Sequence, residues 1–141
     1  MQALLDTIAQ TPIADTHEHL ITATEYAALA PDIINGLFGM HSYLLYEFVS
    51  AGCTYADIEA FLDQTDPDIV ARWDRIAPYW RACRFTGPGE AVSLAAHALY
   101  GISELSGAAL AEAATTHDRF LGTAGYSAIL AQANLSDIQV D

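Results

Sequence analysis

A long run of helical patterns between two short strand-like segments constrains the fold more than any other feature. From Thr24 to Asn134, apolar residues recur at helical spacing, punctuated by capping residues, prolines and glycines. Before this run, the segment PIAD is brief and apolar, which is typical of a buried strand, and after it LSDIQVD alternates apolar and polar residues. We therefore predict a mainly α chain, with a first strand at about 12–16, helices over about 22–134 and the start of a second strand at about 136–141.

Individual helix ends can be predicted from capping residues. Thr54, Ser106 and Thr123 stand where an N-terminal cap is expected. Pro78 lies inside one helical pattern and predicts a kink, and Gly87 is expected to end that helix.

The chain has 141 residues and shows no repeat or linker, so a single domain over 1–141 is predicted. A strand followed by helices and a second strand is how a parallel α/β sheet begins, and about one such repeat is present.

Charge and hydropathy exclude some classes of partner. Eighteen acidic residues against five arginines and no lysine give a formal net charge of -13, which would repel nucleic acid and an anionic membrane. No apolar run reaches the ~20 residues that a membrane span needs. The N-terminus lacks a basic region, so it does not resemble a signal peptide, and a cytoplasmic protein is expected. Cys53 and Cys83 are isolated and read as buried small residues, although a disulfide is not excluded.

The stretch PIADTHEHL holds the clearest candidate site. On a strand, residues two apart point to the same face, so Asp15, His17 and His19 share one face and Glu18 points away. Two adjacent imidazoles can bind a divalent metal of the zinc type at the carboxyl end of a strand, where parallel α/β sheets place their ligands. The alternative is that both histidines are ordinary loop residues or cap the next helix.

IADTHEHL resembles the first-strand signature of the amidohydrolase superfamily, the metal-dependent TIM-barrel hydrolases, and is most similar to its amidohydrolase-2 branch. The helical segments GLFGMHSYLLYEFVSAG, RWDRIAPYWRACRFTG and AAHALYGISEL also resemble that branch, in which a large helical insertion follows the first strand. The resemblance implies a parent (β/α)8 barrel with His17 and His19 as metal ligands, probed most simply with Zn²⁺, and a small-molecule substrate.

The resemblance also implies ligands that this chain does not supply. In that family, further ligands come from later strands: a lysine or glutamate, two histidines and an aspartate. This chain has no lysine, so a carboxylated-lysine bridge between two metals cannot form within it. Because a full barrel needs roughly 250 residues, we expect an N-terminal piece: a truncated gene product, an expressed fragment or one part of a larger assembly. An unpaired first strand would seek partners, so a homo-oligomer is expected.

Other candidate residues have less specific patterns. His41 lies near glycines at a helix start and could face the pocket, but a surface or core histidine is the commoner case. Four arginines fall in one helical stretch and could bind a carboxylate substrate, Arg84 at the helix end being the best candidate; pairing with nearby acids such as Asp68 and Asp74 is the simpler expectation. Trp73, Tyr79 and Trp80 are expected in the core, and His97 and His117 are assigned no role.

Two hypotheses of different classes follow. The first is that the parent protein is a metal-dependent hydrolase in which metal-activated water attacks an amide or related bond; decarboxylation or isomerisation are alternatives within the same family. The second is a non-catalytic acidic helical interaction module, or a fragment that is inactive by itself. No catalytic residue beyond the metal ligands is assigned.

Overall fold

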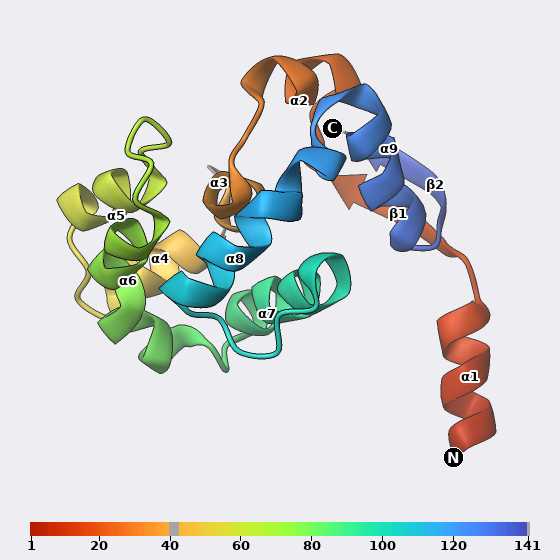
Figure 1. Cartoon of the computed structure of the whole chain (residues 1–141). Helices are drawn as coiled ribbons and strands as arrows, with labels where there is room; N and C mark the ends of the chain where they lie inside the picture. Colours follow the sequence, from red (N-terminus) through yellow and green to blue (C-terminus); the bar gives the residue numbers. More distant parts are fainter. Residues whose placement is uncertain (40–42, 141) are drawn as a thin grey trace. The chain divides into compact units, whose positions relative to one another are not determined.

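A computed structural model of the chain describes residues 1–39 and 43–140, which form mainly helices (Figure 1). The described α-helices are α1 (Gln2–Gln10), α2 (Ala23–Leu29), α3 (Ile33–Phe38), α4 (Tyr43–Ser50), α5 (Tyr55–Leu62), α6 (Ile69–Cys83), α7 (Gly87–Tyr100), α8 (Gly107–His117) and α9 (Gly122–Gln132), with a 3-10 turn, η1 (Asp118–Phe120), before α9. The strands are β1 (Ile13–Glu18) and β2 (Leu135–Val140). The prediction of a mainly α chain with a short strand near each end is confirmed.

The described residues form two compact units. The strand unit contains residues 1–30 and those from 119 onward, and the helical unit contains residues 31–118. The helical unit is thus inserted into the connection between the two strands. Within the described ranges, no helix has both the length and the apolar character needed to cross a bilayer.

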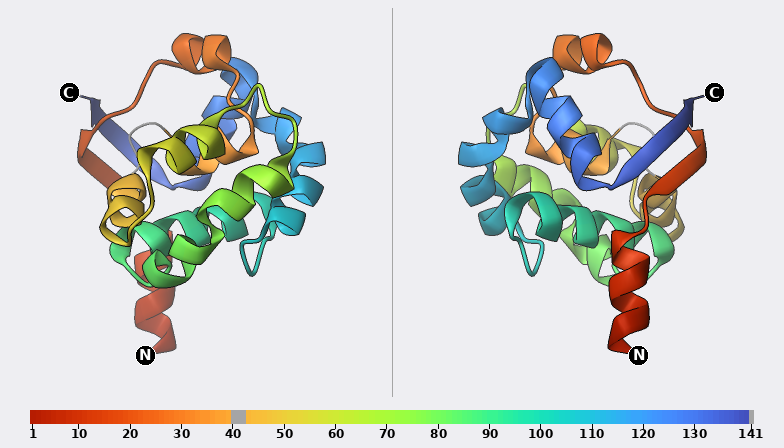
Figure 2. Two further views of the ribbon diagram at one scale, coloured as in Figure 1. Left: turned by 90° about the vertical axis from the view of Figure 1, so that its left-hand side faces the viewer. Right: turned by 90° about the vertical axis from the view of Figure 1, so that its right-hand side faces the viewer.

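The two strands of the strand unit pair in parallel, and Figure 2 shows their arrows side by side and pointing the same way. Ile13 lies opposite Leu135 and Asp15 opposite Ile138, with irregular register between these pairs and at the far end. β1 runs to Glu18, beyond the predicted end at residue 16, because β2 continues to pair with it. β1 is therefore not the wholly unpaired strand that the sequence led us to expect.

Two tyrosines hold the helices of the strand unit together. The rings of Tyr26 on α2 and Tyr126 on α9 stack with centroids 4.7 Å apart, and the Tyr126 hydroxyl donates a hydrogen bond to the Ile21 carbonyl over 2.8 Å. Thr22 caps α2 and exchanges hydrogen bonds with Glu25, which is a capping box. The segment that follows β1 is therefore anchored by both a side-chain hydrogen bond and a helix cap.

The helical unit has its own apolar core, in which aromatic rings meet edge to face. Phe38 is fully buried, and its ring centroid lies 5.0 Å from that of Phe61, 6.1 Å from Trp73 and 6.2 Å from Trp80. Such arrangements add to the stabilisation from burial. The expectation that Trp73 and Trp80 lie in the core is confirmed, and Tyr79 packs partly buried against it.

A buried arginine joins four segments of the helical unit. Arg72 on α6 is only 2% exposed; its Nε donates to the Phe61 carbonyl over 2.9 Å, and its Nη1 forms an ion pair with Asp32 and a longer bond to the Asp66 carbonyl. Asp32 also caps α3 by accepting from the Asn35 backbone N–H over 2.8 Å. The expectation that the arginines of this helix pair with Asp68 or Asp74 is wrong for Arg72, because folding brings a carboxylate from 40 residues away to it.

The structure tests the predicted helix ends. Thr54 and Ser106 cap α5 and α8 as expected, and Pro78 lies inside α6. Thr123 is not a cap, because α9 begins one residue earlier, at Gly122. Gly87 starts α7 rather than ending α6.

The turn between α6 and α7 explains that second error. A Cβ on Gly89 would lie 2.2 Å from the Cys83 carbonyl oxygen, so the two helices approach too closely there for any side chain. Gly89 therefore belongs to the first turn of α7, where only glycine fits against the end of α6.

Candidate metal site at the end of strand β1

The two histidines of the motif lie next to each other at the carboxyl end of β1. His17 is in the strand and His19 follows immediately after it. Their ring centroids are 4.9 Å apart, the planes stand at 83°, and both side chains are exposed. The prediction that residues 17 and 19 share a face is thus matched by the observed proximity of their rings.

The two rings meet edge to face, and the distance between their centroids is compatible with one shared metal ion. With zinc–nitrogen bonds of about 2.0–2.1 Å and a tetrahedral angle, the centroids of two coordinating imidazoles would lie roughly 5 Å apart. The observed 4.9 Å agrees with that distance. Imidazole nitrogen suits zinc, copper, iron and nickel, so the donor chemistry fits a divalent transition metal.

Asp15 is the nearest further carboxylate along the strand. Its side chain is half-buried, and Oδ1 accepts a hydrogen bond from the His17 backbone N–H over 3.2 Å. The carboxylate therefore stabilises the local strand geometry beneath the histidines. Among the described residues, no group of three or more His, Cys, Asp or Glu side chains is placed to hold a metal ion.

The segment beyond His19 is positioned by contacts within the strand unit. The Tyr126 hydroxyl bonds the Ile21 carbonyl, two residues after His19, and the capping box at Thr22 begins one residue later. These contacts limit the conformations available to the segment and favour a defined position for His19 relative to His17.

The remaining candidate residues lie elsewhere. His41 falls outside the described residues. Arg84 belongs to the helical unit, where its guanidinium stacks 4.5 Å above the Phe85 ring and lies 3.5 Å from Glu104. Its proposed role in binding the substrate of the metal site stays a prediction.

A buried histidine in the helical unit was not anticipated from the sequence. His117 is 4% exposed, and its Nε2 lies 2.8 Å from the Pro31 carbonyl oxygen while Nδ1 lies 2.7 Å from the Tyr100 hydroxyl. Because a carbonyl can only accept, Nε2 carries the proton, and in the neutral ring Nδ1 accepts from Tyr100. His117 thereby ties the last turn of α8 to the segment that enters the helical unit. A single histidine in a helix has no spacing that could have indicated this.

The two cysteines have the environment expected of structural residues. Cys53 and Cys83 are both buried and unbridged, and burial raises the pKa of each thiol. A raised pKa favours the protonated thiol, so neither side chain has the environment of an activated nucleophile.

No family model, curated protein or solved structure matches this chain. Arguments about function therefore depend on the geometry and chemistry described above.

Proposed function

We propose that this chain forms the first-strand portion of a metal-dependent hydrolase built on a (β/α)8 barrel, with His17 and His19 as two ligands of a zinc-type ion. One observation carries the proposal: two imidazoles lie 4.9 Å apart at the carboxyl end of a strand in a parallel pair. In parallel α/β folds, ligands bind at that end of the strands. When bound, the metal would supply an activated water for attack on an amide or related bond.

The exposure of the two strands supports the barrel part of the proposal. Parallel sheets are normally covered on both faces, and their strands are buried. Here no strand residue with a described side chain is buried, and Ile13 is 55% exposed. Further strands and helices beside this pair would bury these residues and could bring additional metal ligands to the same end of the sheet.

The order of elements also supports a barrel interrupted by an insertion. β1, α2, α9 and β2 form a strand–helix–strand unit, and the helical unit lies between α2 and α9 in the sequence. In such a barrel, the helical unit would be a large insertion in the first β-to-β connection. In this proposal, His17 and His19 hold the metal and Asp15 fixes the strand beneath them.

Zinc titration tests the metal-binding part. We expect the wild-type chain to bind Zn²⁺ weakly by calorimetry, because catalytic zinc sites generally use three protein ligands and two imidazoles leave the other positions to water. The H17A/H19A double variant should show no saturable heat. Acidification should weaken binding in the wild type because protons compete for the imidazole nitrogens.

His97→Ala is the matched control, because His97 is an exposed histidine on α7. It should leave zinc binding unchanged. If the double variant binds zinc as well as the wild type, the histidine pair is not a metal site.

The proposal that the chain belongs to a barrel can be tested separately, by reading the gene sequence. An in-frame continuation beyond Asp141 with histidines and an aspartate after predicted strands would support it, and a continuation without such strands and ligands would contradict it.

A second candidate function, a non-catalytic interaction module, is favoured by the helical unit. Its core is self-contained, and Tyr43, Tyr46 and Tyr55 are each 69% exposed on its surface. Exposed tyrosines are frequent in protein interfaces. Intact zinc binding by the strand unit would not exclude this role for the helical unit.

A further inference from the structure

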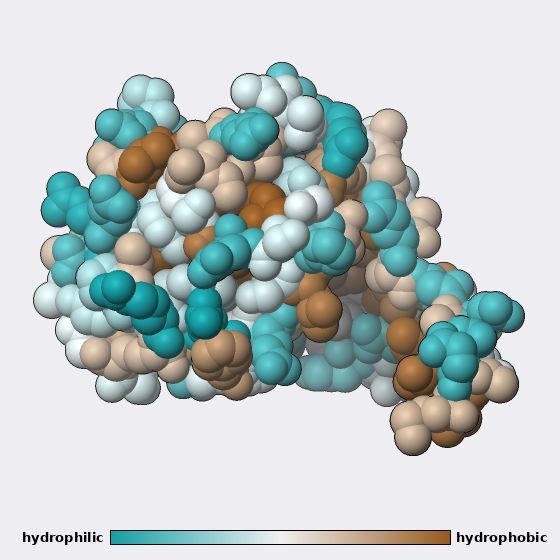
Figure 3. All heavy atoms as spheres, turned by 60° about the horizontal axis from the view of Figure 1, so that its bottom comes forward, coloured by the Kyte–Doolittle hydropathy of each residue, from teal (hydrophilic) through white to brown (hydrophobic). Residues whose placement is uncertain are grey.

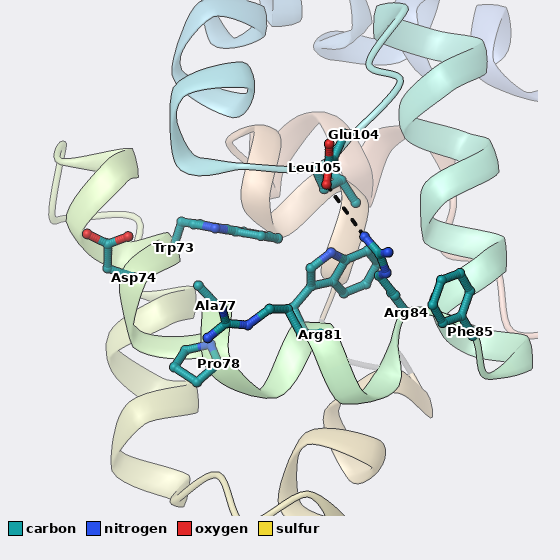
Figure 4. A pocket seen from close by; sticks show the side chains of 10 residues that line it. Trp73, Asp74, Ala77, Pro78, Arg81, Arg84, Phe85, Glu104 and Leu105 are labelled. Carbon is teal, nitrogen blue, oxygen red and sulfur yellow. Dashed lines mark ion pairs between the residues drawn. The ribbon is translucent and has the colours of Figure 1, made fainter.

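A second candidate binding site lies within the helical unit, independent of the histidine pair. A hollow of about 580 Å³ is formed by one side of α6 and the segment between α7 and α8 (Figure 4). Its volume falls within the range of small-molecule sites. A smaller adjoining hollow of about 350 Å³ shares five lining residues with it, so these residues lie where the two meet: Trp80, Arg84, Phe85, Glu104 and Leu105.

The charges around the hollow are balanced. Arg81 and Arg84 contribute two positive charges, and Asp74 and Glu104 contribute two negative charges. The chain has only five basic residues against eighteen acids, so its overall field opposes the approach of a simple anion. A ligand that carries one charge of each sign has no net charge, so this field does not oppose it, and it could satisfy both kinds of side chain.

The ion pair at the hollow is open to such a ligand. In Figure 4, Arg84, the residue that follows α6, points toward Glu104 on the facing segment. The distance between their charged atoms is 3.5 Å, longer than the 2.7–2.9 Å of a strong charge-assisted hydrogen bond. The side chains are 38% and 81% exposed, and an exposed pair contributes little stability that a ligand would have to replace. The guanidinium is also held from one side by its stack on Phe85 at 4.5 Å, which restricts its orientation before a ligand arrives.

Apolar groups border the charged ones. Trp73, Trp80 and Leu105 form the floor of the hollow and belong to the core, so only their edges, at most 7% of each residue, are exposed to it. Phe85, 73% exposed, adds an accessible aromatic face beside Arg84. A hydrophobic side chain of a ligand would therefore find apolar surface within reach of both charged groups.

We propose that this hollow binds a small zwitterion of the α-amino acid class with a large apolar or aromatic side chain. The ligand carboxylate pairs with Arg84, its ammonium pairs with Glu104, and its side chain lies against the aromatic residues. The ligand thus inserts into the open ion pair and replaces one long contact with two shorter ones.

The chain offers a specific reporter for this site. Its only two tryptophans, Trp73 and Trp80, both line the hollow. The emission of both tryptophans, excited at wavelengths where phenylalanine does not absorb, should change saturably as L-phenylalanine is added. Calorimetry with the same ligand should give the same dissociation constant. N-acetyl-phenylalanine lacks the ammonium and phenylalanine amide lacks the carboxylate, and each should bind roughly two- to fivefold more weakly, the scale of one exposed charge pair.

Variants assign the two charged partners. Arg84→Gln and Glu104→Gln should each weaken L-phenylalanine binding roughly two- to fivefold. Arg75→Gln, a change of an exposed arginine on the same helix that does not line the hollow, should leave it unchanged. Circular dichroism confirms that each variant is folded.

Two results would overturn the proposal. The first is no saturable binding of L-phenylalanine to the folded wild type by either method. The second is equal binding of the zwitterion and both capped analogues, since that would show a non-specific apolar surface. H17A/H19A should bind L-phenylalanine like the wild type, so a failure here is distinguishable from a failure of the metal site.

Discussion

The helical unit and the strand unit bury very different amounts of apolar surface. The helical unit has a core in which Phe38, Phe48, Phe61 and Ile76 are fully buried. In the strand unit, the buried residues are few, chiefly Phe120 and Tyr126, and all residues of α1 are exposed. Figure 3 shows apolar residues, coloured brown, on the surface of α1 at the lower right of the view.

This difference indicates which of the two units buries enough apolar area to be stable by itself. Burial of apolar area is the main stabilising term in folding, so the helical unit has the material for an independent domain. The strand unit instead depends on one parallel strand pair and one tyrosine stack. The four predictions below test this contrast, from the largest expected effect to the smallest.

The largest effect is expected in the core of the helical unit. Phe38→Ala should lower the free energy of unfolding by about 3–5 kcal/mol, because it removes a buried ring and leaves a cavity among three aromatic neighbours. Urea unfolding followed by tryptophan emission measures it, since both tryptophans are in this unit. Phe85→Ala, which removes the same side chain from a position 73% exposed, should change stability by less than about 1 kcal/mol. Equal losses in the two variants would show that the aromatic cluster is not the centre of the core.

The buried arginine should come next. Arg72→Met should destabilise the helical unit by about 3 kcal/mol, because it leaves the Asp32 carboxylate and the Phe61 carbonyl without their partner. Arg75→Met removes an exposed arginine from the same helix and should have little effect. A small loss in the Arg72 variant would mean that water replaces the guanidinium.

The same network predicts a dependence on pH. Burial raises the pKa of Asp32, but the hydrogen bonds and charge of Arg72, with hydrogen bonds from Asn35, outweigh it and lower the pKa below its ordinary 3.8. The stabilisation from this carboxylate is therefore fully present above pH 3.8 and is lost as the pH falls through the lowered value. The unfolding free energy of the wild type should decline in that range, and Asp32→Asn should flatten the decline. A slope unchanged by Asp32→Asn would assign the acid sensitivity to other carboxylates.

The smallest effect is expected in the strand unit. Tyr126→Phe removes the hydrogen bond to the Ile21 carbonyl and should lower local stability by about 1 kcal/mol, measured by hydrogen exchange of the amides in β1, α2 and α9. Tyr26→Phe keeps the ring stack and should change exchange little. If Tyr126→Phe leaves the exchange rates unchanged, the ring stack, which both variants keep, and not the hydrogen bond holds the segment after β1.

Local patterns explain how much of the fold was predictable. Thr54 and Ser106 were identified as caps because their hydroxyls satisfy backbone groups only a few residues away. Thr123 and Gly87 were misassigned because the observed ends depend on neighbouring segments. At Gly87, α7 begins because the Thr86 side chain caps it by accepting from the Gly89 backbone N–H.

The candidate metal site also has one feature that the sequence predicts and one that it does not. The pairing of His17 and His19 was predictable because a strand places alternate residues on one face, which is a local property. The strand itself extends to Glu18 because β2, more than a hundred residues later in the chain, pairs with it.

The sequence by itself therefore determined most of the helices, the caps at Thr54 and Ser106 and the adjacency of the histidines, because each depends on neighbours within a few residues. Only the tertiary structure decided that Arg72 pairs with Asp32, that His117 bonds Pro31 and that Arg84 meets Glu104. Each of these contacts joins residues far apart in the chain. No spacing in the sequence records such pairs, because they form only when the packing of apolar faces has brought their helices together.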